Sequence, residues 1–131
     1  MALDRQMPVL VVDDSDTMIS ILRSLLRQIG FAEVNDANDG AQALAKMRTK
    51  RYGLVISDWN MQPMTGCELL QEVRRDEILK QTPFIMVTAE SRVENVIAAK
   101  KAGVSNYIIK PFTANALREK IESVMAASQA R

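Results

Sequence analysis

The sequence predicts a doubly wound α/β fold, in which helices cover both faces of a five-stranded parallel sheet. Short apolar runs recur along the 131 residues without the polar alternation of half-exposed strands, which indicates strands buried on both faces. A stretch with helical spacing of apolar residues follows each run, so strand and helix alternate five times. Right-handed crossovers leave few topologies for such a chain, and we expect a (βα)5 three-layer sandwich.

The strands are expected at the apolar runs 8–12, 32–34, 54–57, 84–87 and 106–109, of which 32–34 is the weakest. Ser15 and Asp16 offer caps for the first helix, which Gly30 ends, and Thr113 caps the last helix. Residues 38–40 open the second helix, and residues 126–131 are expected to fray. Apolar residues at helical spacing are expected to face inward in the later helices: Ala41, Ala43, Leu44, Met47, Leu69, Leu70, Val73, Val93, Val96, Ile97, Ala98, Leu117, Ile121, Val124 and Met125.

We expect a single domain over residues 1–131, with its core at about 8–125 and no output domain after it. Hydrophobic residues make up 47% and charged residues 25%, which is ordinary for a soluble globular protein. Lys and Arg total 17 and Asp and Glu total 16, which gives no electrostatic case for binding nucleic acid or an anionic membrane. No apolar run approaches the ~20 residues of a membrane span, and no signal peptide is recognisable, so we expect a cytoplasmic monomer.

The chain contains no histidine and a single cysteine, Cys67. One cysteine excludes an internal disulfide and fits a reducing compartment. The lack of histidine rules out His-based catalytic triads and His-ligated zinc. Any chemistry must therefore use carboxylates, Lys, Thr, Ser or the backbone, with or without a hard cation.

A basic cluster made of Lys46, Arg48, Lys50 and Arg51 crowds the end of the second helix. Two interpretations are open. The cluster is either a basic docking patch, or a solvated face on which cations are favoured by the helix C-terminus. The second arrangement is the more common one.

Four of the expected strands end on a polar residue that can do chemistry: Asp13 with Asp14, Asp58, Thr88, and Lys110. In an open parallel sheet, ligands bind outside the carboxyl ends of the strands, at the point where the strand order reverses. In the order 2-1-3-4-5, strands 1 and 3 are neighbours there, so three carboxylates come together. Each residue alone has an ordinary explanation, such as a helix cap or a surface lysine. All of them in register at strand ends are hard to obtain by chance.

Three carboxylates in one small site need a counter-charge, because like charges a few ångströms apart raise each other's pKa. Mg²⁺ suits the site, since it takes a few carboxylates and keeps some waters. A metal, the Lys110 ammonium, the Thr88 hydroxyl and backbone N–H groups make a cradle for a tetrahedral phosphoryl group. The nucleophile is expected to be a carboxylate, and Asp58 is the candidate as the lone acid on the central strand.

These motifs resemble the receiver domain of two-component response regulators, and most closely its stand-alone CheY-like chemotaxis members. The matching residues are Val11-Val12-Asp13-Asp14-Ser15, Asp58-Trp59-Asn60-Met61, Met64-Thr65-Gly66, Thr88-Ala89 and Lys110-Pro111-Phe112. As a set they are highly specific, and the resemblance extends from about Pro8 to Met125. It implies the flavodoxin-like strand order 2-1-3-4-5. It also implies a signalling protein, not an enzyme, whose only chemistry is phosphotransfer to and hydrolysis from its own aspartate.

The resemblance implies that Asp58 accepts a phosphoryl group from a phosphohistidine on a CheA-like histidine kinase. Asp14 and Asp58 are then direct ligands of Mg²⁺, and Asn60 binds the metal through its backbone carbonyl. Asp13 acts mainly through metal-bound water.

The resemblance also implies that Thr88, the amide of Ala89 and Lys110 contact the phosphoryl group, with a cis peptide expected after Lys110. Tyr107 matches an aromatic residue that moves inward when the threonine moves. Asn60 and Glu90 match positions at which the family varies its dephosphorylation rate, and both are of the fast-hydrolysing type.

A flagellar motor switch protein is the partner that the resemblance favours, through the surface of the fourth helix, fifth strand and fifth helix. A phosphatase is a further expected partner. A phosphate sink and a phosphorelay intermediate stay open as alternatives. An aspartyl-nucleophile phosphatase would need a second acid where Asn60 stands. A flavin or nucleotide binder would need a phosphate-binding loop after the first strand, where residues 13–16 would repel phosphate.

One position departs from the family pattern. The family usually places a proline four residues after the phosphorylated aspartate, where this chain has Gln62, and the proline follows one residue later as Pro63. Because the flanking residues Asn60, Met61 and Met64 keep their register, this departure bears on the shape of the loop and not on the metal site.

Overall fold

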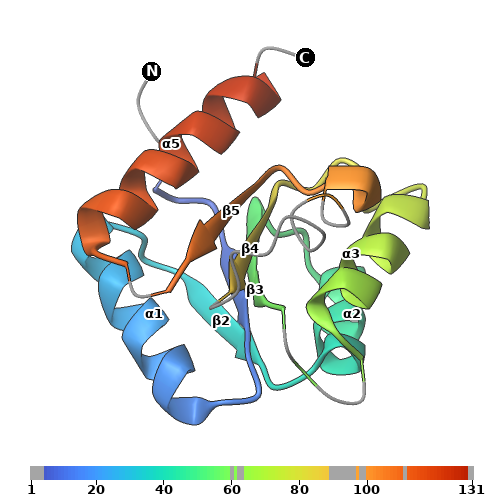
Figure 1. Ribbon diagram of the computed structural model, residues 1–131, viewed down its shortest axis with the longest axis horizontal. Helices are drawn as coiled ribbons and strands as arrows, with labels where there is room; N and C mark the ends of the chain where they lie inside the picture. The colour runs from blue at the N-terminus through green and yellow to red at the C-terminus, as the bar shows by residue number, and fades with distance from the viewer. Residues whose placement is uncertain are drawn as a thin grey trace.

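The computed structural model describes residues 5–59, 61, 64–88, 97, 100–110 and 112–129. From β1 to β4 its elements alternate between strand and helix, as the sequence predicts (Figure 1). Most of the stretch between β4 and β5, where the fourth helix is expected, lies outside the described residues. They are β1 (Val9–Val12), α1 (Asp16–Ile29), β2 (Val34–Ala37), α2 (Gly40–Thr49), β3 (Leu54–Asp58), α3 (Gly66–Arg75), β4 (Phe84–Thr88), β5 (Asn106–Ile109) and α5 (Ala114–Gln129).

The strands form one sheet in the order β2-β1-β3-β4-β5, and all four neighbouring pairs are parallel. Helices α1 and α5 cover one face of this sheet and α2 and α3 cover the other (Figure 1). The expected three-layer sandwich and its strand order are therefore confirmed.

Each face of the sheet carries its own apolar cluster, and β1 supplies both. Val9 and Val11 belong to the cluster under α1 and α5, whereas Leu10 and Val12 belong to the cluster under α2 and α3. Successive strand residues point to opposite faces, and all four of these side chains are fully buried. Burial on both faces explains why the strands appear in the sequence as continuous apolar runs.

The helix ends confirm the expected caps. The side chain of Ser15 accepts a hydrogen bond from the backbone N–H of Met18 at 3.3 Å, and Gly30 ends α1 with a φ of 118°. This left-handed conformation favours glycine because a Cβ would be strained there. Asp39 caps α2 through the N–H of Gln42 at 2.8 Å, and Thr113 accepts from the N–H of Ala116 at 3.1 Å.

The second strand lies further along the chain than expected, at Val34–Ala37 instead of 32–34. Its central residues, Asn35 and Asp36, are polar because β2 is an edge strand whose side chains find distant partners. Asn35 accepts from the hydroxyl of Tyr52 at 2.7 Å, and Asp36 forms a 2.7 Å ion pair with Arg23. Those partners are remote in sequence, so no local apolar pattern marked this strand.

Three expectations for the helices were wrong. Ala41 is exposed, and Gly40 is buried instead, because the side chain of Met64 lies where a Cβ of Gly40 would be. Ile97 is 46% exposed and not inward, while Val93, Val96 and Ala98 lie outside the described residues. Helix α5 continues to Gln129, where fraying from residue 126 was expected, because the buried Val124 holds its last turns on the core. None of the described helices is long and apolar enough to span a membrane.

Candidate functional site

Sheet topology brings the polar strand ends to one edge. Strand β1 lies beside β3 with Val12 opposite Ser57, so Asp13 and Asp58 follow as neighbours. Strand β3 lies beside β4 with Asp58 opposite Val87, so Thr88 stands one residue beyond. The backbone N–H of Lys110 donates to the carbonyl of Thr88 at 2.8 Å, which fixes the end of β5 at the same edge.

Three carboxylates meet at this edge in an acidic cluster made of Asp13, Asp14 and Asp58. Each offers one oxygen, and these oxygens all lie within 4.8 Å of one another. Asp13 and Asp58 are only 2% and 7% exposed, whereas Asp14 is exposed. Two largely desolvated carboxylates beside a third are costly unless positive charge offsets them.

Of the three carboxylates in the cluster, that of Asp13 has the least compensation for its negative charge. Its Oδ1 accepts from the N–H of Ser15 at 2.9 Å, but its buried Oδ2 has no hydrogen-bond partner among the described residues. The pKa of Asp13 is raised to about 6, with burial as the largest cause. The Ser15 hydrogen bond and the charge of Lys110 act to lower this pKa, and the charges of Asp58 and Asp14 act to raise it. An orphaned carboxylate oxygen in such a cluster fits a hard cation, so the residues present suit a divalent metal.

Lys110 supplies positive charge to the cluster from the end of β5. Its Nζ lies 3.1 Å from Oδ1 of Asp58, and their side chains are 28% and 9% exposed. Thr88 is buried close by on β4. A carboxylate and an ammonium therefore meet here, and Thr88 ends the neighbouring strand at the same edge of the sheet.

Several predicted site residues cannot be placed in this cluster. Asn60, Ala89, Glu90 and Pro111 lie outside the described residues, as do Gln62 and Pro63. Tyr107 is half-buried on β5 and packs against the core under α2 and α3, away from the acidic cluster. Its ring centroid lies 5.6 Å from Nζ of Lys120 on α5, a cation–π contact that sequence reasoning missed.

Gly66, the first residue of α3, supports the site in a way that the sequence analysis overlooked. Its N–H donates to the carbonyl of Trp59 at 2.9 Å, and a Cβ at this position would lie 2.1 Å from the backbone oxygen of Asp58. Thr65 and Glu68 form a capping box that fixes this helix start. The Thr-x-x-Glu spacing was a readable signal that a helix begins directly beside Asp58.

Comparison with known sequences agrees with this geometry. The model of the response regulator receiver domain family matches residues 9–122. Chemotaxis protein CheY of Pseudomonas aeruginosa is 47% identical over 118 residues, which cover 90% of this chain and 95% of that protein. Chemotaxis protein CheY-3 of Vibrio cholerae is 44% identical over 93% of this chain and 94% of that protein.

Solved structures agree as well. The chemotaxis response regulator CheY4 of Vibrio cholerae has a TM-score of 0.84 and 36% identity, over 91% of this chain and 98% of that one. The response regulator TrrA from Thermotoga maritima, solved in complex with Mg²⁺ and BeF, has a TM-score of 0.81 and 30% identity, over 91% of this chain and 99% of that one. With its acidic cluster at the switch point of the sheet, the chain belongs to the response regulator receiver domain family, as a CheY-like chemotaxis regulator that signals and is not an enzyme.

Proposed function

We propose that Asp58 accepts a phosphoryl group from a phosphohistidine of a CheA-like histidine kinase and thereby switches the protein between two states. The observation that carries this proposal is the position of Asp58, which lies in the acidic cluster with Lys110 on its Oδ1 at 3.1 Å. In the transfer, a carboxylate oxygen of Asp58 forms the new P–O bond. The P–N bond of the donor breaks, and its electron pair stays with the imidazole nitrogen.

The donor set of the acidic cluster supports Mg²⁺ as the cofactor. Asp14 and Asp58 would bind it directly, Asn60 through its backbone carbonyl, and Asp13 through a metal-bound water. The orphaned Oδ2 of Asp13 supports this assignment, and the TrrA receiver has been solved with Mg²⁺ and BeF. When bound, Mg²⁺ supplies positive charge that neutralises the phosphoryl oxygens during transfer.

The groups around Asp58 have separate tasks toward the phosphoryl oxygens. The ammonium of Lys110, already paired with Asp58, turns to a phosphoryl oxygen. The hydroxyl of Thr88 and the amide of Ala89 donate hydrogen bonds to the other oxygens. Asn60 and Glu90, at positions where the family varies its dephosphorylation rate, have the task of setting how readily water hydrolyses the group, alone or with a phosphatase.

The same contacts explain how the phosphoryl group changes a distant surface. Aspartyl phosphate adds a charge of about −1.5 to −2, which draws Thr88 and Lys110 toward it. Lys110 follows β5, the strand that carries Tyr107, and the Tyr107 ring moves into the space that Thr88 leaves. The surface of the fourth helix, β5 and α5 then favours its partner, a flagellar motor switch protein. This is a shift between two populated states of one fold.

Trp59 offers a direct test because it follows Asp58 and is only partly exposed. Mg²⁺ at millimolar concentration is expected to quench its fluorescence, and acetyl phosphate is expected to change the signal again. Asp58→Asn should abolish the second change, because no aspartyl phosphate forms. A silent wild type, or a full acetyl phosphate response in Asp58→Asn, would refute the site assignment.

The output is tested separately by capturing partners with the phosphorylated protein. A motor switch protein retained by wild type with acetyl phosphate, and not by Asp58→Asn, is the expected result. Retention of a histidine kinase alone would point to a phosphate sink or a relay, and would leave the assignment of Asp58 intact.

A further inference from the structure

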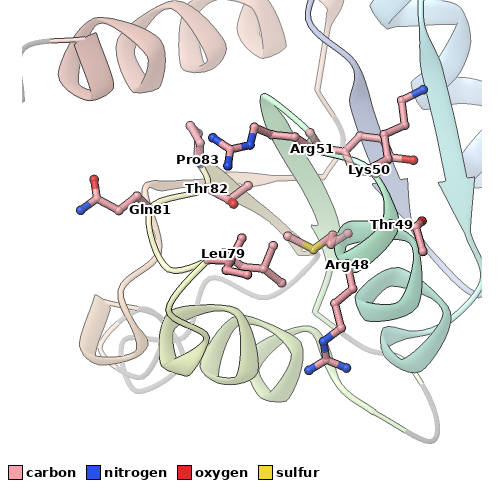
Figure 2. A pocket seen from close by; sticks show the side chains of 11 residues that line it. Arg48, Thr49, Lys50, Arg51, Leu79, Gln81, Thr82 and Pro83 are labelled. Atoms are coloured by element: carbon pink, nitrogen blue, oxygen red, sulfur yellow. The ribbon is translucent and has the colours of Figure 1, made fainter.

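A pocket lies at the opposite edge of the sheet from the acidic cluster. It has a volume of about 380 Å³ and is formed by two chain segments, as Figure 2 shows. Residues 47–52 lead from α2 into β3, and residues 78–83 lead from α3 into β4. Both segments precede their strands, so the pocket opens at the amino-terminal edge and stands apart from the phosphoryl-transfer site. The volume of this pocket is close to the lower end of the range known for ligand pockets, which is about 300 Å³.

The rim of this pocket is cationic. Arg48, Lys50 and Arg51 line it, and none of its lining residues is acidic. The chain as a whole is almost neutral at +1, so the positive charge at this rim is a local excess. The acidic cluster is the corresponding excess of negative charge at the other edge. Local charge of one sign attracts ligands of the other sign and raises their association rate.

The three cationic side chains differ in how strongly they are already paired with carboxylates. Lys50 pairs with Glu33, and Figure 2 shows its amino end pointing away from the pocket. Arg48 contacts Asp76 only loosely, at 3.8 Å. Arg51 forms no ion pair with any carboxylate of the described residues and extends toward Thr82 and Pro83 (Figure 2). Arg51 and Arg48 are therefore available to an incoming anion, one on each side of the pocket.

The carboxylate of Asp76 does not compete strongly for Arg48. Its Oδ1 accepts the backbone N–H groups of Ile78 at 2.8 Å and of Leu79 at 3.2 Å, and these bonds hold the start of the segment that enters β4. Only Oδ2 faces Arg48. Both groups are partly exposed, so the pair contributes little to stability.

The buried floor of the pocket is apolar, while Thr49, Gln81 and Thr82 add polar side chains to its lining. Met47, Tyr52 and Leu79 form its buried floor, and Ile78 stands at the rim with 79% exposure. No large hydrophobic side chain in the described part of the chain is more exposed than Ile78. The Tyr52 hydroxyl already donates to Asn35, so the floor presents no free polar group to a small anion. An apolar side chain fits such a floor better than a phosphate, and methionine adapts to varied partners.

We propose that this pocket docks an acidic peptide segment of a partner protein. One aliphatic side chain of the segment packs against Ile78 and Leu79, and flanking carboxylates face Arg48 and Arg51. The basic cluster at the end of α2 is then a docking patch and not only a favourable helix end. Because Asp58 lies at the other edge of the sheet, the segment can stay bound while the phosphoryl group is transferred.

The test uses synthetic octapeptides in which Asp and Glu flank one central Leu, Ile or Met, each labelled for fluorescence anisotropy. We expect saturable binding that weakens when salt rises from about 50 to 300 mM, since the rim charges are screened. Arg48→Gln with Arg51→Gln should weaken binding about tenfold. Ile78→Ser should weaken it about fivefold, and so should a Ser at the centre of the peptide.

Matched controls distinguish specific peptide binding at this pocket from nonspecific attraction between the peptide and positive charge elsewhere on the protein. Arg27→Gln with Arg118→Gln removes the same charge from exposed positions on α1 and α5, and Ile21→Ser removes an exposed isoleucine of α1. Both should leave peptide binding within about twofold of wild type. The proposal is overturned if no peptide binds, if the control arginines matter as much as the rim arginines, or if peptides with a central Ser bind equally well. Tighter binding of a nucleotide or inorganic phosphate at the same residues would also overturn it.

Discussion

Gly66 packs against the backbone carbonyl of Asp58 so closely that a Cβ would lie 2.1 Å from the carbonyl oxygen and 2.9 Å from the sulfur of Met86. The obstacle is main chain, which cannot rotate aside as a side chain can. Gly66 therefore does more than begin α3, because it sets the position of the strand end that carries the proposed phosphoryl acceptor.

Replacing Gly66 with alanine should displace Asp58 and impair the site more than it impairs the fold. We expect a loss of about 1–3 kcal/mol in the free energy of unfolding, as for other overpacked sites. The Mg²⁺ dependence of Trp59 fluorescence should shift to markedly higher concentration. Gly53→Ala is the matched control, because its Cβ would meet only the side chain of Met7, far from the cluster. Equal Mg²⁺ titrations for the two variants would contradict this role of Gly66.

Asp13 should make the metal-free protein less stable as the pH rises. Burial raises its pKa from 3.8 to about 6 in the folded protein, so the unfolded chain loses this proton first. The free energy of unfolding should therefore fall through this window, by up to about 3 kcal/mol, and stay lower above it. Asp13→Asn should remove that loss, and urea unfolding at pH 4 and pH 7 without Mg²⁺ measures it.

Two comparisons make this pH effect specific. Glu122→Gln, on an exposed position of α5, should keep the wild-type difference between the two pH values. Added Mg²⁺ should stabilise wild type at pH 7 more than Asp13→Asn, because it offsets the charge that the variant lacks. A metal-free Asp13→Asn variant that is less stable than wild type at pH 7 would show that Asp13 is satisfied in some other way.

The strands and their polar ends were predictable because both depend on local sequence, whereas the order of the strands came from the resemblance to the family. Continuous apolar runs mark strands buried on both faces, and topology then brings Asp13, Asp58, Thr88 and Lys110 to one edge. The edge strand β2 was predicted two residues too early, at 32–34, because the stabilising partners of Asn35 and Asp36 come from other elements. Contacts such as that of Lys120 with Tyr107 were not predictable either, because they depend on the position in which a helix packs and no local sequence pattern indicates them.

Arg74 gives the clearest example of such a long-range contact, and it should be important for stability. From α3, its Nε donates to the carbonyl of Gly103 at 2.8 Å, and its Nη1 donates to the carbonyls of Lys80 at 3.0 Å and Thr82 at 2.7 Å. The guanidinium thus ties the segment before β4 to the turn before β5. Arg74→Lys cannot reproduce this fork and should cost about 2–3 kcal/mol by urea unfolding.

Arg75→Lys is the control for this substitution, since among the described residues Arg75 pairs only with Glu72 on the surface, and the two side chains are 69% and 42% exposed. Its free energy of unfolding should change by less than about 0.5 kcal/mol. Hydrogen exchange should also speed up at the Phe84 amide in Arg74→Lys, because that amide donates to Ser105 in the turn that Arg74 holds. Equal stability of the two variants would mean that the fork is not needed.

Lys120 should hold the ring of Tyr107 in its present position and so oppose the proposed switch. Its Nζ lies 5.6 Å from the ring centroid, a contact that contributes about 0.5–1 kcal/mol at partly exposed sites. Lys120→Met keeps most of the aliphatic side chain and removes the charge, so it should raise the inward population of the ring about two- to fivefold.

Fluorotyrosine NMR can follow the inward population of the ring, because the chain has two tyrosines and the buried Tyr52 serves as an internal reference. Lys101→Met, on an exposed lysine, should leave the Tyr107 signal unchanged. If Lys120→Met also leaves it unchanged, with and without acetyl phosphate, the contact does not restrain the ring.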